Sequence, residues 1–140
     1  MAEHLEKLEQ IAQDICDEFD VYAPPVPLEL MLQEPKEDMW EELDINQLSG
    51  SFMKLTERYS PRMSLARMLA RHIVRSDWGA EHGLQALVRD KDTLKIFARM
   101  LIMPREMVNG LTSSMKNPKI MSTHFEAPES EAEARLFDLV

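Results

Sequence analysis

The sequence predicts a mainly helical domain of the α+β class, with a small β-hairpin or short sheet packed on a central helix. Apolar residues recur at three- and four-residue steps over most of the chain, the period of amphipathic helices. Prolines fall between these segments, where they end one helix or open the next. A segment around 43–56 lacks the helical period and contains a Ser-Gly-Ser turn signal, which favours a small hairpin.

The first part of the chain predicts two helices and the hairpin. Residues 3–19 place apolar side chains on one face and acids on the other. Three prolines at 24, 25 and 27 end this helix, and a short helix at 28–33 follows them. We expect the hairpin to pair residues 43–47 with 51–56.

The middle and the end of the chain predict further helices. The strongest begins after Pro61 and runs to about Ser76; its wide apolar face is typical of a helix buried in the middle of a domain. A loop is expected at 78–83. Later helices are expected at 93–102, at 105–111, after Pro118, and from Pro128 to 139.

Length and residue content limit the class of protein. The chain has 140 residues and a mass of 16.2 kDa, so we expect one domain over 1–140 that folds without a disulfide or a metal. The one cysteine, Cys16, gives no disulfide framework, and we expect it to be a small core residue. There is no basic leader at the start and no apolar run of membrane-spanning length, so we expect a cytoplasmic protein that does not enter a membrane.

Charge is unevenly distributed. The formal net charge is −9, which argues against direct binding of nucleic acid. Residues 1–46 hold fourteen acids and two bases, residues 47–110 hold six acids and eleven bases, and residues 111–140 hold five and three. An acidic first third therefore accompanies a basic middle.

The residues contain little that is typical of an enzyme. No two of the four histidines are three or four residues apart, so no helical turn presents a two-histidine metal site. His72 has no other histidine near it in the sequence, and Glu81 with His82 is a candidate pair for acid–base catalysis with little to support it. There is no nucleophile elbow and no glycine-rich phosphate loop. We expect no cofactor, no metal and no catalytic residue.

Four sequence blocks carry a resemblance to a known family. Residues 61–74 (PRMSLARMLARHIV) look like the active-site helix of ImmA/IrrE-type zinc metallopeptidases, typically R-[RF]-[ST]-L-A-H-E-x-[GA]-H-x-[LI]-L. Residues 97–104 (FARMLIMP) are similar to the family's F-A-x-x-L-L-M-P. Phe125 with Arg135-Leu136 resembles its closing segment, and residues 24–29 (PPVPLE) resemble its P-P-V-D-L-E entry. The blocks span 24–136 in the family's order, and the resemblance implies a zincin-like helical domain.

The chain departs from that family at the catalytic positions. Two histidines one turn apart would bind zinc there, and the glutamate between them would act as general base. This sequence has Arg67, Met68 and Arg71 at those positions, and Asp92 is the acid nearest the third ligand position. Arginine has no lone pair for a metal, and methionine cannot accept a proton from water. The resemblance therefore implies a degenerate HExxH motif.

Three functions remain open. The first is a non-catalytic pseudopeptidase that binds a protein, such as a helix-turn-helix repressor, and so regulates transcription. The second is a hydrolase with a different centre around His72, His82 and Asp92, assisted by Glu81. The third is a small structural or adaptor domain that associates with itself through Trp40 and the acidic segment.

The arginines on the strongest helix have three possible roles. Arg67, Arg71 and Arg75 are each four residues apart and so lie in line along one edge. They can pair internally with carboxylates of the acidic first third, bind an acidic peptide or a phosphate-bearing ligand, or face solvent. The methionines at helical spacing are expected in the core, with a methionine-lined groove for a partner helix as the alternative.

Overall fold

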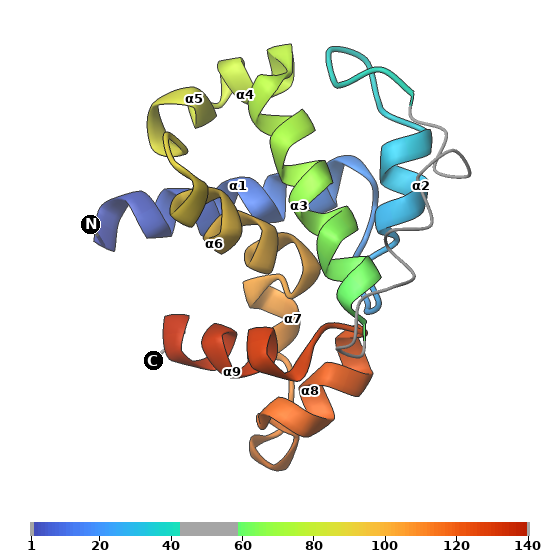
Figure 1. Cartoon of the computed structure of the whole chain (residues 1–140), viewed down its shortest axis with the longest axis vertical. Coiled ribbons are helices and arrows are strands. Elements are labelled where there is room, and N and C mark those ends of the chain that lie inside the picture. Colours follow the sequence, from blue (N-terminus) through green and yellow to red (C-terminus); the bar gives the residue numbers. More distant parts are fainter. Residues whose placement is uncertain (1, 43–58, 140) are drawn as a thin grey trace.

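The computed structural model describes residues 2–42 and 59–139, and these residues form a packed set of helices (Figure 1). The longer helices are α1 (Ala2–Glu18), α3 (Ser60–Arg75), α6 (Lys91–Ile102), α8 (Pro118–Phe125) and α9 (Glu129–Asp138). The shorter ones are α2 (Leu28–Gln33), α4 (Asp77–Glu81), α5 (Leu84–Leu87), α7 (Arg105–Asn109) and a 3₁₀ turn at Ser113–Met115.

The helices α3 and α6 form the centre of the fold. They pack closely on each other, and α1 packs on α6 behind them (Figure 1). The core-facing side of α3 buries Met63, Leu65, Ala66, Leu69, Ala70 and Ile73. The strongest predicted helix is thus confirmed as the central, buried one.

The helices α8 and α9 form a separate pair at one end of the molecule, at the bottom of Figure 1. Asn117 caps α8, because its side-chain oxygen accepts a hydrogen bond from the backbone N–H of Ile120 at 2.9 Å. Pro118 occupies the first turn of α8, where no backbone donor is needed. The helix α9 joins the pair to the rest of the molecule by packing on α6.

The predicted α+β class is wrong for the described part of the chain. Across residues 2–42 and 59–139 every regular element is a helix. The hairpin expected at 43–47 and 51–56 lies outside the described residues. Helices take the place of the expected sheet as packing partners of the central helix, because α2, α4, α5 and α6 all contact α3. The described fold is all-helical.

The loop expected at 78–83 is also wrong, since α4 occupies most of it. The hydroxyl of Ser76 accepts a hydrogen bond from the backbone N–H of Gly79 at 3.0 Å and donates one to the carbonyl of Ile73 at 2.7 Å. Ser76 therefore ends α3 and caps α4 at the same point. Two glycines in the segment suggested a loop, but the serine cap and the buried Trp78 favour a short helix.

The other predicted helices are confirmed within a few residues. Periodicity located α1 and α6 correctly, and the preceding prolines located α2 and α9. The helix α6 starts two residues earlier than expected because Asp90 caps it, accepting from the backbone N–H of Thr93 at 2.7 Å. None of the helices in the described part of the chain combines the length and apolar character needed to cross a bilayer.

The core contains several residues for which the sequence allowed other roles. Cys16 is buried, and burial with the nearby Asp17 raises the pKa of its thiol to about 12, so it is an inert core residue. Trp40 is 7% exposed, stacks on Phe19, and donates from its indole nitrogen to the carbonyl of Leu32 at 3.3 Å. The methionines at helical spacing, as expected, belong to the core or pack against it: Met63, Met68, Met100, Met103 and Met107.

Candidate functional site

The candidate site is the edge of α3 that carries Arg67, Met68, Arg71 and Arg75, the first three at the positions that the resemblance aligns with an HExxH motif. Arg67 and Met68 are half-buried there, and Arg71 and Arg75, farther along α3, are exposed. Met68 packs against the core. The helix therefore holds the motif residues in line, as their spacing predicts, but gives them different surroundings.

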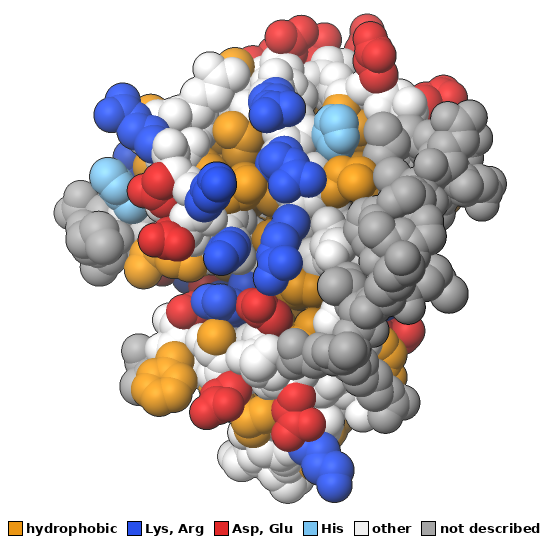
Figure 2. Space-filling model, viewed as in Figure 1, with side chains coloured by type: hydrophobic (Ala, Val, Ile, Leu, Met, Phe, Trp, Pro, Cys, Tyr) orange, Lys and Arg blue, Asp and Glu red, His pale blue; other side chains and the backbone are white. Residues whose placement is uncertain are grey.

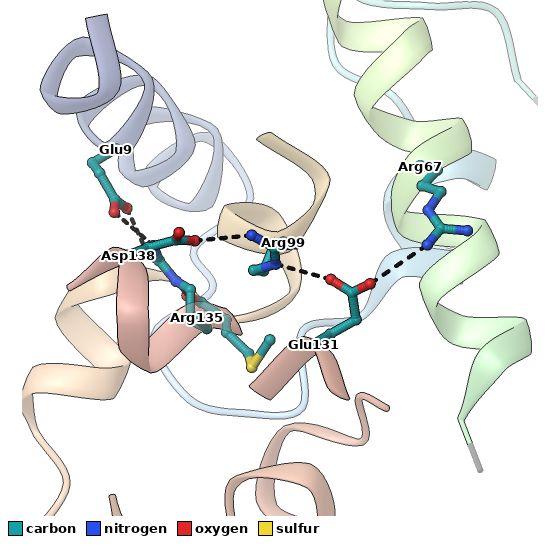
Figure 3. Close-up of polar contacts among 7 residues, drawn as sticks. Glu9, Arg67, Arg99, Glu131, Arg135 and Asp138 are labelled. Carbon is teal, nitrogen blue, oxygen red and sulfur yellow. Dashed lines mark hydrogen bonds and ion pairs between the residues drawn. The ribbon is translucent and has the colours of Figure 1, made fainter. Parts of the chain in front are cut away.

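Arg67 takes part in a network of ion pairs between α3, α6 and α9 (Figure 3). Its guanidinium Nη2 lies 3.5 Å from a carboxylate oxygen of Glu131 on α9. Nε of Arg99, on α6, donates to the other oxygen of Glu131 at 2.9 Å, and Nη1 of Arg99 donates to Asp138 at 3.2 Å. Glu131 thus joins two arginines from two different helices.

This network is partly removed from water. Burial alone would lower the pKa of Arg99, but its hydrogen bonds and charge interactions with Glu131 and Asp138 raise that pKa above the usual value. Among the described residues, Nε of Arg67 is buried and has no hydrogen-bond partner. The polar contact of the Arg67 side chain with the described residues is therefore its ion pair with Glu131.

Arg71 and Arg75 belong to a different environment, a basic groove between α3 and the start of α6. Its volume is about 270 Å³. The cationic residues that line it are Arg71, Arg75, Arg89 and Lys91. All four are exposed, and none forms an ion pair within the described part of the chain. Figure 2 shows Lys and Arg side chains gathered on this face, over α3 and α6.

Apolar residues and one acid complete this groove, which we call the α3–α6 groove. Val74, Val88 and Leu94 supply apolar surface, and Asp90 is the acid. The carboxylate of Asp90 already accepts hydrogen bonds from the backbone and the hydroxyl of Thr93, which lower its pKa. The groove therefore combines an apolar wall with four cations that have no ion-pair partner among residues 2–42 and 59–139, which suits an anionic ligand that also has an apolar part.

The acidic first third pairs with arginines, but not with those at the motif positions. Glu29 pairs with Arg62 at 3.5 Å and Glu6 with Arg105 at 2.7 Å. Within the described residues the partner of Arg67 is Glu131, from the last helix. Within the described residues, Arg67 thus pairs internally, whereas Arg71 and Arg75 form no ion pair.

Sequence reasoning missed the most deeply buried ion pair of the described residues. Arg135 is fully buried, and its Nη1 and Nη2 both donate to the carboxylate of Glu9 at 2.6 Å (Figure 3). Its Nε donates to the carbonyl of Met103 at 2.8 Å. The available signal was the position of Arg135 between Ala132 and Leu136 on the apolar face of its helix, where a charge requires a partner.

The residues of the alternative hydrolase centre are not joined to one another by any hydrogen bond or ion pair among the described residues. His82 stacks on Trp78, with ring centroids 3.7 Å apart, and its Nδ1 lies 2.8 Å from the carbonyl of Trp78. His72 lines a separate cavity of about 410 Å³ beside Trp40 and Arg75. Glu81 and Asp92 are exposed. No hydrogen bond or ion pair among the described residues connects His72, His82 and Asp92.

The described residues also offer no ready cation site. Within 2–42 and 59–139, no three His, Cys, Asp or Glu side chains are grouped so that they could hold a metal ion. The first and second motif positions carry a cation and a thioether instead of the ligand and the base that the resembled family uses.

Comparison with known proteins adds nothing to this geometry. None of the protein-family models, curated proteins or solved structures with which the chain was compared matches it. The likeness to ImmA/IrrE-type peptidases therefore depends on the four sequence blocks alone.

Proposed function

We propose that this protein is a non-catalytic, ImmA/IrrE-like regulatory module that acts by binding another protein. The observation that carries the proposal is Arg67, which stands at the first zinc-ligand position of the resembled helix and pairs with Glu131 at 3.5 Å. A helix-turn-helix repressor is the partner class that the resemblance favours.

The physical argument concerns charge at the motif. A guanidinium is permanently protonated, so Arg67 and Arg71 offer no electron pair to zinc and repel a divalent cation. Turning Arg67 aside to admit a metal would separate it from Glu131, which remains bound to Arg99. Met68, at the general-base position, has no group that takes a proton from water.

Zinc content tests the non-catalytic part of the proposal. The purified protein, incubated with zinc chloride and dialysed, should retain only substoichiometric zinc by mass spectrometry. The variant Arg67→His/Met68→Glu/Arg71→His restores the motif, so it should retain more zinc than the natural sequence. Equal zinc in the two proteins would contradict the assignment of these positions to a former zinc site.

Repressor binding tests the regulatory part. A helix-turn-helix repressor should form a complex with the protein in calorimetry and should remain intact on a gel. Stoichiometric zinc in the natural protein, together with repressor cleavage that a chelator abolishes, would overturn the proposal.

A further inference from the structure

We propose that the α3–α6 groove binds a short acidic peptide segment that carries an apolar side chain. This inference rests on the proposed function, because it names the chemistry by which the module would recognise its protein partner. It assigns the contact to Arg71, Arg75, Arg89 and Lys91 and leaves Arg67 out.

Charge selects an anionic occupant. Four cations line the groove against one carboxylate, that of Asp90, which already accepts hydrogen bonds from Thr93. No acid within the described residues, Asp90 included, forms an ion pair with these cations. Their charge-assisted donors are therefore available to carboxylates of a partner, which arginine binds in bidentate fashion.

The positions of the cations favour more than one carboxylate. Arg71 and Arg75 are one helical turn apart on α3, about 5–6 Å between Cβ atoms. Arg89 and Lys91 border the groove from the segment that leads into α6 and from its first residue. A peptide that carries one acidic side chain before and one after its central residue would therefore have a cation to contact on each wall of the groove.

The apolar wall of the groove favours a peptide whose central residue is apolar. Val74 and Leu94 are half-buried and line the groove together with the buried Val88, so they give it an apolar wall beside the cations. Figure 2 shows hydrophobic side chains between the basic ones on this face. A volume of about 270 Å³ has room for a few side chains rather than a whole folded element.

The charge of the rest of the chain disfavours nucleic acid as the occupant. A duplex carries phosphates far beyond the groove, and the chain as a whole has a formal net charge of −9. A short acidic segment contacts only the basic groove and also fills its apolar wall. An acidic protein segment therefore satisfies both features, whereas a phosphate backbone satisfies one.

Fluorescence anisotropy with a labelled twelve-residue peptide tests the proposal on the full chain. The probe repeats Glu-Glu-Leu four times, and a second probe repeats Glu-Glu-Ser with the same charge. We expect the leucine probe to bind roughly fivefold or more tightly than the serine probe, since the serine loses the apolar contact. We expect Arg71→Glu/Arg75→Glu to weaken binding of the leucine probe at least tenfold.

Lys116→Glu/Lys119→Glu is the matched control. It makes the same charge change at two exposed lysines that do not line the groove, so binding should stay within twofold of the natural protein. Circular dichroism establishes that each variant is folded, and Arg71→Gln/Arg75→Gln replaces the glutamate variant if that one unfolds. Equal losses in the groove and control variants would overturn the proposal, as would equal binding of the two peptides.

The third probe is a duplex DNA that carries the same fluorescent label as the peptides. Binding of this DNA that depends on Arg71 and Arg75, without binding of the leucine peptide, would overturn the acidic-peptide assignment in favour of phosphate. A zinc-free, non-cleaving protein that fails to bind the peptide would overturn the groove and leave the non-catalytic proposal in place. Zinc-dependent cleavage of a repressor would overturn the non-catalytic proposal, and binding of the leucine peptide would still support the groove.

Discussion

Arg67, Arg71 and Arg75 are evenly spaced along α3 but have different surroundings, because different parts of the chain pack beside each of them. Arg67 has 38% of its side chain exposed and meets Glu131 of α9. Arg71, one turn farther, borders the α3–α6 groove, and Arg75 borders both that groove and the cavity beside His72. The role of each guanidinium therefore follows from its neighbours and not from its place in the motif.

Loss of the buried arginine on α9 should strongly destabilise the protein. Arg135→Met leaves the carboxylate of Glu9, in a residue that is 6% exposed, without its partner. Breaking one side of a buried ion pair typically costs about 3–5 kcal/mol of unfolding free energy. Urea denaturation followed by circular dichroism measures the loss.

Two further variants separate the charge effect from the packing effect. Arg105→Met removes an ion pair whose acid, Glu6, has a side chain 67% exposed, so it should cost about 1 kcal/mol or less. Glu9→Leu/Arg135→Met removes both buried charges and should recover most of the stability lost by Arg135→Met alone. Equal losses for Arg135→Met and Arg105→Met would contradict the structural role of the buried pair.

His72 should make the protein less stable in mild acid. Burial, and then the charges of Arg71 and Arg75, lower the pKa of its imidazole. The unfolded chain therefore binds a proton at this residue more readily, and stability declines as the pH falls below about 6.5 towards the lowered pKa. Urea midpoints between about pH 7 and pH 5 should fall less in His72→Gln than in the natural protein.

The control for this pH effect is an exposed histidine. His4→Gln changes a histidine at the exposed start of α1 and should keep the pH dependence of the natural protein. If His72→Gln and His4→Gln lost stability in parallel, protonation of His72 would not be the cause.

At the scale of the elements, α3 and α4 approach each other closely at their junction. Ser76 bonds both helices, and Gly79 lies directly against the backbone of α3. A Cβ atom on Gly79 would collide with the carbonyl oxygen of Ile73 and lie 3.0 Å from that of Val74. Only glycine permits this approach without a shift of the backbone.

Gly79→Ala should therefore destabilise the protein by about 1–3 kcal/mol, the usual range for overpacking a buried site. Gly110→Ala is the control, because its added Cβ would be 3.4 Å from the nearest atom and its backbone is in the right-handed helical region. Thermal unfolding should show a marked drop in midpoint for Gly79→Ala and little change for Gly110→Ala. Similar midpoints for the two variants would refute the close approach of α4 to α3.

At the scale of the whole molecule, one continuous core connects the ends of the described chain. It includes residues of α1, α3, α6, α8 and α9, and both tryptophans, Trp40 and Trp78. The buried pair of Glu9 and Arg135 ties α1 to α9 across 126 positions of sequence. The α8–α9 pair is thus part of the same packed unit.

This continuity predicts a single cooperative unfolding transition. Far-ultraviolet circular dichroism reports all the helices, whereas tryptophan fluorescence reports Trp40 and Trp78. The two signals should give the same urea midpoint and slope, as expected for a two-state domain of this size. A separate, earlier transition seen by circular dichroism alone would indicate that part of the molecule unfolds independently.

The local pattern of apolar residues was sufficient to predict most of the longer helices, but it did not predict how neighbouring helices join. The period of apolar residues located α1, α3 and α6, because burial of one face depends on spacing within a few turns. It missed α4 and α5, which are too short for periodicity. The helix α4 depends on the Ser76 cap, and both helices pack against α3. It also predicted an α+β class where the described residues are all helical.

By itself, the sequence determined where the longer helices lie and that arginines occupy the edge of α3 where the resembled family has zinc ligands. The tertiary structure decided which of those arginines have partners. Glu131 pairs with Arg67 of α3 from a distant position in the sequence, as Glu9 does with Arg135 of α9 across 126 positions, so no local spacing relates these partners. The α3–α6 groove likewise brings Arg71 and Arg75 together with Arg89 and Lys91 from the following elements. Ion pairs and grooves depend on the packing of distant segments, whereas helix formation depends on neighbours along the chain.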